Sequence, residues 1–464
     1  MELSLRGGLQ STSEVDLRST SPLAKISGRD RSIVWIFGTA LVALFIKLAI
    51  AYNTFGTNDV VAFYTFARSL NDHGLEWTYR NGVVWFSNFP VFNHPPLTAY
   101  FLQFIDSLSR QAFFRDCGLT FPFLLRLPGI IADFVVVLVL LRMSRTVTEL
   151  RVPAWALVVF ALSPVSLMVS GFHGNTDPVM VMFLVLAAYM CFCGRPLLCG
   201  ILFAMSCQIK IIPLLLFPIV FFFWLGRQAA LRFTIPFMLL SVAMWSQPLV
   251  GFPVLFVKNV LAYGSYWGSW GITYWLRSTR CPQFNVAGFL NLPPAAAVVA
   301  SLLKAGIVSA VLVIGWRRRC LSAGAAISSV AYAWIVFFIF SPGVCPQYMI
   351  WLAPFILILS PAFYGWLTVT SSLFLFFFYN GLADGFPWFI GTSRFDNPDR
   401  FNLLTPWSLW PWATLVCGMI LFWKKAVAAD PSLRLFTLKT FSLQGVDIGI
   451  VTAPLQDRHK AGHG

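Results

Sequence analysis

The sequence predicts an all-α polytopic membrane protein, and three features of its composition lead to this. Of 464 residues, 58% are hydrophobic and only 11% are charged, whereas soluble domains carry about 25% charged residues. The mean hydropathy is +0.74. The chain also contains 46 Phe and 18 Trp, and membrane proteins use aromatic residues heavily at the lipid boundary. A soluble protein, a disordered protein and a disulfide-framework protein are therefore excluded.

Apolar runs bounded by charges, Pro and Gly predict about 12 transmembrane helices. The predicted ranges are 33–51, 127–142, 153–170, 178–193, 197–208, 211–225, 233–250, 294–316, 325–341, 347–361, 363–380 and 407–423. The runs at 197–208 and 211–225 are interpreted as two short helices that meet near Lys210 and Pro213. A single span there would place the following basic loops on the wrong side of the membrane.

Lys and Arg residues predict the orientation, because short cytoplasmic loops are rich in them. Arg29 and Arg31 precede the first span, and basic residues recur on the same side at Arg142, Arg145, Arg151, Arg195, Arg227, Arg232, Arg317, Arg318, Arg319, Lys424 and Lys425. This gives a cytoplasmic tail at 1–32, a transmembrane domain at 33–425 and a second cytoplasmic tail at 426–464. The net charge of +15 is thus accounted for by orientation, and no nucleic-acid partner is expected.

Three long segments, 52–126, 251–293 and 381–406, then lie on the outer face. The first contains two amphipathic stretches, 59–73 and 96–110. The first stretch presents one apolar face at helical spacing, formed by Val60, Phe63, Tyr64, Ala67 and Leu70. Such helices lie in the plane of the membrane interface, so any chemistry is expected on the outer face.

Polar residues of this face are candidate site residues, each with a structural alternative. Asp59 is either a general base toward a hydroxyl or, with Asn58, a helix cap. His94, before two prolines, either orients a sugar or phosphate or hydrogen-bonds the turn. His173 and Asp177 are either turn residues or ligands on the same face as Asp59.

Charged residues near or inside the spans are costly and need partners. Lys210 either snorkels to the interface or contacts a phosphate. Arg126 has either a structural role or a phosphate contact, and Asp133, two turns further along the same helix, must face protein or water.

Motifs for other chemistry are missing from the sequence. The nine cysteines form neither a metal site nor a clear disulfide set. There is no phosphate-binding Gly-rich loop, zinc-type His pair or nucleophile elbow. An energy-coupling ATPase is therefore excluded, a hydrolase with a nucleophile elbow is disfavoured, and no metal or other cofactor is expected.

Four stretches together resemble the GT-C superfamily of membrane glycosyltransferases, which use polyprenyl- or dolichyl-phosphate sugars. The stretch at 345–354 is similar to a segment of GPI mannosyltransferase I and of bacterial polyprenol-phosphate-mannose-dependent mannosyltransferases. The four stretches are Asp59-Val-Val-Ala-Phe-Tyr-Thr-Phe-Ala-Arg68, His94-Pro-Pro-Leu-Thr-Ala-Tyr100, Arg126-Leu-Pro-Gly-Ile-Ile-Ala-Asp133 and Cys345-Pro-Gln-Tyr-Met-Ile-Trp-Leu-Ala-Pro354.

The resemblance implies a GT-C-like fold and an inverting glycosyltransferase, with mannose as the favoured sugar. Its partners would be a lipid-linked sugar donor, a glycan or glycolipid acceptor and membrane lipids. The roles implied by the resemblance are a catalytic base at Asp59 and donor contacts at Lys210, Gln347 and Tyr348. From residue type and position, Arg126 is added as a donor contact, and His94, His173 and Asp177 as acceptor or sugar contacts. A lipid-linked-sugar flippase or transporter is the alternative function, and a scaffold without enzymatic activity, which would not need Asp59 and Lys210 on one face, is a third. A bacterial cytoplasmic membrane is the expected location, with the endoplasmic reticulum membrane as the alternative.

Overall fold

The computed structural model describes residues 28–82, 92–147, 150, 152–262, 266–286, 292–383, 385–388 and 405–429. Residues Met1–Leu421 contain one compact unit, and Phe422–Gly464 form a second unit of which only the end of one helix is described. Almost all of the two predicted tails and most of the third outer segment lie outside the described residues. The part that is described is helical, as predicted.

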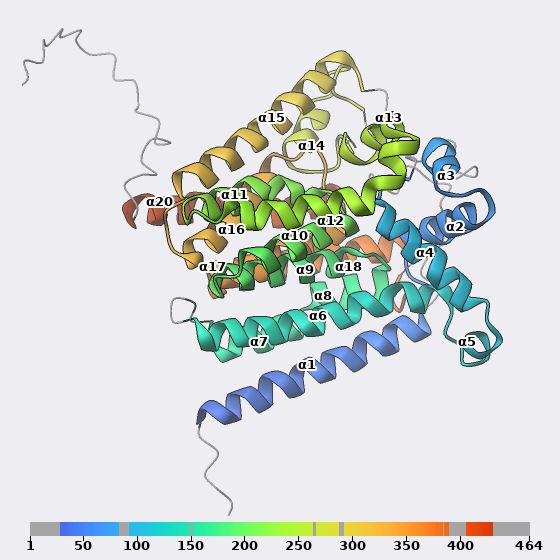
Figure 1. Ribbon diagram of the computed structural model, residues 1–464, viewed down its shortest axis with the longest axis horizontal. Coiled ribbons are helices and arrows are strands. Elements are labelled where there is room, and N and C mark those ends of the chain that lie inside the picture. The colour runs from blue at the N-terminus through green and yellow to red at the C-terminus, as the bar shows by residue number, and fades with distance from the viewer. Residues whose placement is uncertain are drawn as a thin grey trace, which may run out of the picture. The chain divides into compact units, whose positions relative to one another are not determined.

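Within the described residues, seven helical segments are long and apolar enough to cross a membrane. They are α1 (Gly28–Asn53), α6 (Phe121–Thr146), the run from α7 (Ala154–Ala161) through α8 (Pro164–Ser166) to η1 (Leu167–His173), α12 (Ala230–Gly251), α15 (Pro294–Arg317), α16 (Ala323–Phe340) and α18 (Pro361–Leu382). Figure 1 shows α1, α6, α12 and α15 running in roughly the same direction. The chain is therefore a multi-pass integral membrane protein.

The other predicted spans are helices too, but the structure does not establish that they cross. Four apolar segments are shorter: α9 (Asp177–Phe192), α10 (Pro196–Ile209), η2 (Ile212–Leu216) with α11 (Phe217–Leu225), and η4 (Pro346–Tyr348) with α17 (Met349–Leu359). The 16 residues of α9 extend roughly 24 Å at about 1.5 Å per residue, less than a hydrocarbon core of about 30 Å. The last predicted span corresponds to α20 (Thr405–Ala429).

The break between the two short helices lies where the sequence places it. Helix α10 ends at Ile209, Lys210 is extended, and Pro213 lies in the first turn of η2. At the far end of α11, Arg227 Nη2 donates a hydrogen bond of 2.8 Å to the backbone oxygen of Leu321. Two of the basic segments assigned to the cytoplasmic side therefore meet in the structure.

A small group of helices from the first outer segment packs over one end of the long helices (Figure 1). It consists of α2 (Asn58–His73), α3 (Leu75–Asn81), α4 (Pro96–Ser109) and α5 (Ala112–Asp116). Helices α2 and α4 match the two predicted amphipathic stretches within one residue at each end. Val60, Phe63, Ala67 and Leu70 are buried as expected, whereas Tyr64 is exposed.

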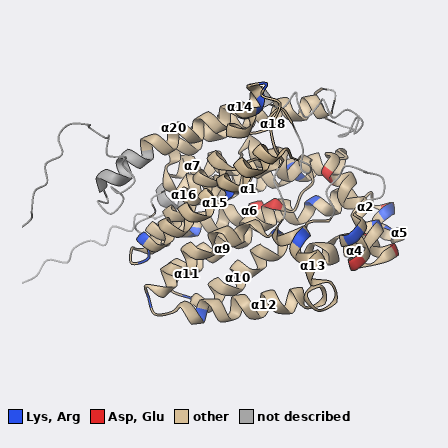
Figure 2. Cartoon of the chain, turned by 90° about the horizontal axis from the view of Figure 1, so that it is seen from above, with Lys and Arg blue, Asp and Glu red and all other residues tan. Residues whose placement is uncertain are grey.

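The outer helices hold a separate apolar core in which α2, α4 and the start of α6 pack with α13 (Pro253–Phe256) and η3 (Val257–Leu261). Asn259 Nδ2 donates a hydrogen bond to the backbone oxygen of Tyr79, which connects η3 to α3. The other described element of the second outer segment is α14 (Gly271–Ser278). Figure 2 shows charged residues concentrated at helix ends and around α2, α4 and α5, with few along the helices. Helices α2, α3 and α4 are thus held against α13 and η3 by an apolar core and a hydrogen bond.

Candidate functional site

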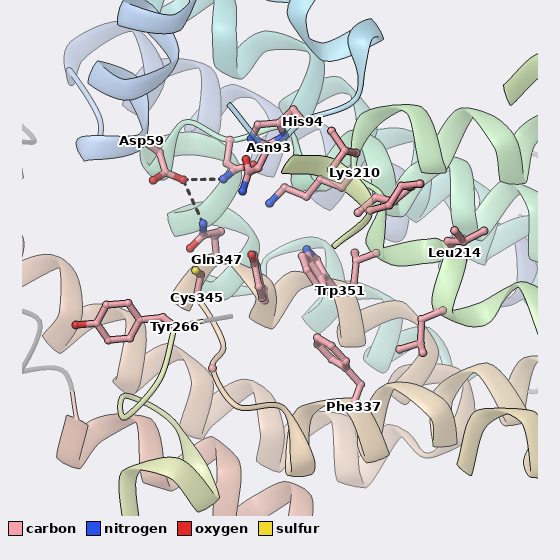
Figure 3. Close-up of a pocket in the computed structure, with 18 of the residues that line it drawn as sticks. Asp59, Asn93, His94, Lys210, Leu214, Tyr266, Phe337, Cys345, Gln347 and Trp351 are labelled. Carbon is pink, nitrogen blue, oxygen red and sulfur yellow. Dashed lines mark hydrogen bonds between the residues drawn. The ribbon is translucent and has the colours of Figure 1, made fainter. Parts of the chain in front are cut away.

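A cavity of about 540 Å³ lies between α2, η2, η3 and the η4–α17 segment. Polar side chains line one part of it, and apolar side chains line the rest. The polar part includes Asp59, Asn93, His94, Asn175, Lys210 and Gln347; the apolar part includes Phe63, Leu214, Leu215, Val260, Val308 and Phe337. Figure 3 shows Asp59, Asn93, His94, Lys210 and Gln347 near one another, with Leu214 and Phe337 further away. Such a division fits an amphipathic molecule.

Asp59 lies in the first turn of α2. Thr57 caps this helix, whereas the structural alternative from the sequence expected Asn58 or Asp59 to be the cap. Thr57 Oγ1 accepts a hydrogen bond from the Asp59 amide at 3.3 Å and donates one of 2.7 Å to the backbone oxygen of His173. Gly174 follows with φ +83°, and a Cβ there would lie 2.2 Å from Val60 Cγ2. A glycine is needed for this approach, which brings the 173–175 turn against α2.

The Asp59 carboxylate is held by three residues far away in the sequence. Its Oδ2 lies 3.0 Å from His173 Nε2 and accepts hydrogen bonds from Asn175 Nδ2 at 2.7 Å and Gln347 Nε2 at 3.1 Å. The other ring nitrogen of His173, Nδ1, lies 2.9 Å from the hydroxyl of Tyr379. The structure thus brings together α2, η1, the loop before α9, η4 and α18 around one oxygen atom.

These contacts decide the charge of Asp59. Burial raises the pKa of its carboxyl group, but the interactions with His173, Lys210 and Asn175 outweigh burial, so the pKa lies below the ordinary value. Asp59 is therefore ionised at neutral pH, and about one quarter of its side chain remains exposed.

Lys210 lies between α10 and η2, and it neither snorkels nor stands alone. Its Nζ lies 2.6 Å from Oδ1 of Asp177, whose side chain is fully buried. The ammonium also lies 4.8 Å from the ring centre of Tyr348 and 5.5 Å from that of Trp351, within the range of cation–π attraction. Asp177, at the start of α9, is therefore the counter-ion of Lys210, and Lys210 borders the cavity.

His94 and the 345–351 segment complete the lining of the cavity near Lys210. His94 lines the cavity, and burial together with the charge of Lys210 lowers its pKa to about 3. It is neutral at physiological pH. Gln347 reaches Asp59, whereas Tyr348 stacks on Trp351 with 3.8 Å between ring centres and borders the cavity near Lys210.

Arg126 does not line the cavity, and its structural alternative is the one observed. Its buried guanidinium donates hydrogen bonds to Thr54 Oγ1 and to five backbone oxygens, those of Ala51, Thr54, Pro122, Gly171 and Phe172. Most of these oxygens lie at the ends of α1 and η1, where backbone carbonyl groups have no N–H partner within their own helix. Arg126 therefore joins α1, α6 and η1 and has no donor group left for a phosphate.

Asp133 faces protein, and its partner is Lys47 of α1, which was not among the candidate residues from the sequence. Lys47 Nζ lies 2.7 Å from Asp133 Oδ2, and Ser170 Oγ donates to the same oxygen at 2.5 Å. Ser166 Oγ contacts both Lys47 and Asp133. The pair connects α1 to α6 away from the cavity lining.

Three site residues were not chosen from the sequence: Asn93, Asn175 and Tyr379. Asn175 lies two residues after His173 and Asn93 directly precedes His94, so the neighbouring histidines pointed to these positions. Tyr379 lies in an apolar run of α18, and nothing in the sequence around it indicates a site. Among the described residues, no group of His, Cys, Asp and Glu is arranged to hold a metal ion.

The family of the chain is decided by a comparison with protein-family models. The model described as "GPI transamidase subunit PIG-U" matches residues 41–288, more than half of the chain. The chain belongs to the PIG-U family. No curated protein matches the chain in a sequence comparison. The matched region contains α2, the Asp59 contacts at 173–175 and Lys210, and it ends before Gln347.

Membership of the PIG-U family corrects the function expected from the GT-C resemblance. A GPI transamidase attaches proteins to GPI and does not transfer sugar from a polyprenyl phosphate. The glycosyltransferase and mannosyltransferase expectations are wrong, and so is the flippase alternative. The expected polyprenyl-phosphate donor and sugar acceptor are also wrong, because a transamidase subunit has protein subunits and a protein substrate as partners. The motifs were misleading because a carboxylate, a lysine and aromatic rings beside apolar helices are not specific to sugar transfer.

Proposed function

We propose that this protein is a membrane subunit of a GPI transamidase and that its cavity holds the GPI glycolipid at the outer face of the membrane. The observation that carries the proposal is the cavity of about 540 Å³ with separate polar and apolar parts, in a chain of the PIG-U family. A glycolipid needs both: polar partners for its headgroup and an apolar surface for its chains.

The apolar part of the cavity is open toward lipid. Leu214 of η2, Leu261 of η3 and Val308 of α15 line the cavity and are also substantially exposed. A lipid chain can therefore extend between these elements into the bilayer while the headgroup contacts the polar part.

The location follows from the family. A GPI transamidase is a complex of the endoplasmic reticulum membrane, so we propose this membrane, the alternative in the sequence analysis, instead of a bacterial one. The outer face of the chain is then the lumenal face.

We also propose that all 12 predicted helices cross the membrane, with the short ones meeting at the cavity. The native cysteines provide the test, because Cys117 is exposed on the predicted lumenal side and Cys193 and Cys320 are exposed on the predicted cytoplasmic side. In single-cysteine variants, a membrane-impermeant maleimide added to intact microsomes should label Cys193 and Cys320 but not Cys117. Labelling of Cys117 before permeabilisation would contradict the topology.

The functional test is rescue of cells that lack their PIG-U subunit. The chain should co-purify with the other transamidase subunits and restore a GPI-anchored reporter at the cell surface. Leu214→Trp, which fills the apolar part of the cavity, should lower the reporter severalfold without loss of co-purification. Leu239→Trp on α12, a strongly exposed position outside the cavity lining, is the control. Failure of the wild-type chain to co-purify would overturn the proposal, and equal activity of the two variants would remove the role of the cavity.

A further inference from the structure

One charged side chain lies deep in a long membrane helix without a partner. Lys304 of α15 is exposed, and it makes no hydrogen bond or ion pair with another residue in the described part of the chain. The other charges well inside the described long helices are satisfied by the fold: Lys47 and Asp133 by each other, and Arg126 by backbone oxygens. A charge inside a membrane is costly and almost always has a partner. Lys304 lacks the partner that the fold supplies to the others.

The depth of Lys304 argues against a contact with the phosphate layer of the membrane. Thirteen residues separate it from Arg317, the first of the basic triplet at the predicted cytoplasmic end of α15. This distance is roughly 20 Å at about 1.5 Å per residue, which leaves roughly 10 Å of a hydrocarbon core of about 30 Å. A lysine side chain is roughly 6 Å long at about 1.5 Å per bond. The ammonium therefore ends within the hydrocarbon region, and its partner is expected at the same depth.

Lys304 belongs to one continuous face of α15. The face recurs at intervals of three and four residues, and it consists of six exposed residues, Ser301, Lys304, Ala305, Val308, Ser309 and Leu312. Three of them, Ser301, Ala305 and Ser309, are small and lie four residues apart. This spacing of small residues allows two membrane helices to approach closely. The charge is therefore set in a face that is shaped for another helix.

Helix α15 is also the least covered of the seven long apolar segments. Only 17% of its apolar window is buried inside the chain, against 22–67% for the other six. On α12, in contrast, the exposed residues near the middle of the helix are bulky and apolar, as suits contact with lipid: Ile235, Met238, Leu239 and Val242. A charge among small residues on α15 fits a second helix better than it fits lipid.

The partner must bring a negative charge, and a second copy of this chain does not offer one. Within the described membrane helices the carboxylates are those of Asp133 and Asp177. Both are buried, and both are already paired, with Lys47 and Lys210. The carboxylate that complements Lys304 therefore belongs to a different protein.

We propose that this face of α15 binds a transmembrane helix of another subunit of the complex, which places an Asp or Glu side chain against Lys304 and a small residue against Ala305. The inference rests on the proposed function, in that it requires an assembled complex, and it adds the surface and the chemistry of the partner. Val308 belongs both to this face and to the lining of the cavity. The partner helix thus lies beside the side of the cavity that opens toward lipid.

The first test measures assembly and stability separately. Tagged full-length variants are expressed in cells that lack their PIG-U subunit, and the other transamidase subunits retained in mild detergent are counted by quantitative mass spectrometry. Lys304→Leu should lower their recovery severalfold, because the partner's carboxylate is left unpaired, and Lys304→Arg should retain most of it. The free energy of unfolding of the Lys304→Leu chain alone should not fall, because the chain itself loses no contact.

The second test concerns the small residues. Ala305→Leu should also lower the recovery of the other subunits severalfold, because the added bulk holds the two helices apart. Ala243→Leu makes the same change at an exposed position of α12 and should assemble as the wild type does.

The third test identifies the partner. A p-benzoylphenylalanine residue in place of Leu312, an exposed position of the face, should cross-link in microsomes to a transmembrane segment that contains Asp or Glu. Lys304→Glu should lower the recovery of the other subunits, and replacing that acidic residue with Lys should restore it.

The possible failures are distinguishable. Normal recovery of the subunits with Lys304→Leu, or cross-links from position 312 to lipid only, would overturn the inference and leave the proposed function in place. A cross-link to a second copy of the chain, or to a segment without Asp or Glu, would overturn it as well. If the wild-type chain recovers no other subunit, the proposed function and the inference fail together.

Discussion

The ion pair between Lys47 and Asp133 gives a sharp prediction about how α1 is attached to the bundle. The two side chains are 4% and 12% exposed and lie 2.7 Å apart. Removal of one partner from a buried pair leaves an uncompensated charge and costs about 3–5 kcal/mol, whereas replacing both with apolar residues is often neutral or stabilising. Asp133→Leu and Lys47→Met should therefore each destabilise the protein by about 3 kcal/mol or more, and the double variant by about 1 kcal/mol or less.

The measurement is unfolding in mixed micelles titrated with sodium dodecyl sulfate, which gives a free energy for each variant. The control pair is Glu76 and Arg80, which lie 2.6 Å apart but have side chains 51% and 63% exposed. Its single variants should change the free energy by less than about 1 kcal/mol, because exposed pairs contribute little. If the Lys47/Asp133 double variant is as unstable as the single variants, the charge-compensation argument is wrong, and the hydrogen bonds of Ser166 and Ser170 must be the stabilising feature.

Three further predictions concern stability and are read from the same unfolding titration. Arg126→Met should cost about 3 kcal/mol or more, because buried backbone oxygens at two helix ends lose their donors, and Arg126→Lys should cost less; equal costs would contradict this explanation. Gly343→Ala should destabilise the protein, since a Cβ there would lie 1.7 Å from the backbone oxygen of Tyr266. Because Tyr266 lines the cavity, the variant should also bind lipid more weakly. Unchanged lipid binding would show that Gly343 does not influence the shape of the cavity. The pKa of Asp59 is lower in the folded chain than in the unfolded chain, so its contribution is present above about pH 4 and is lost as pH falls through the folded value. Asp59→Asn should therefore reduce the loss of stability below pH 4, and an unchanged acid limb would contradict it.

Much of the fold was predictable because its signals are local. Apolar runs of suitable length, the 3.6-residue periodicity of 59–73 and the basic residues at the ends of runs depend only on neighbouring positions. All 12 predicted ranges overlap helices for this reason. Which of the shorter helices cross the membrane depends on how they pack at Lys210, and this is not a local property.

The site was predictable in its residue types and not in its pairings. Asp59, His94, Lys210 and Gln347 do line one cavity, because a polar group beside an apolar span requires a reason to be there. The same rule applies to Lys47, which lies within a predicted span and therefore needs a partner in the structure. The assignment of Asp177 to a ligand and of Arg126 to a phosphate failed because a charge inside a fold is most often satisfied by the fold itself, here by Lys210 and by backbone oxygens.

The geometry of Asp59 also gives a physical reason to accept the PIG-U assignment over the expected catalytic base. A general base works best when its pKa lies near the operating pH, and one whose anion is strongly stabilised is a poor proton acceptor. In this chain three side chains, those of His173, Asn175 and Gln347, converge on Asp59 Oδ2, and the pKa of Asp59 is lowered. Such an arrangement stabilises the anion and fixes its direction, which weakens proton abstraction. The features that made Asp59 look like an enzyme's base in the sequence are, in the structure, those of a permanent and oriented negative charge.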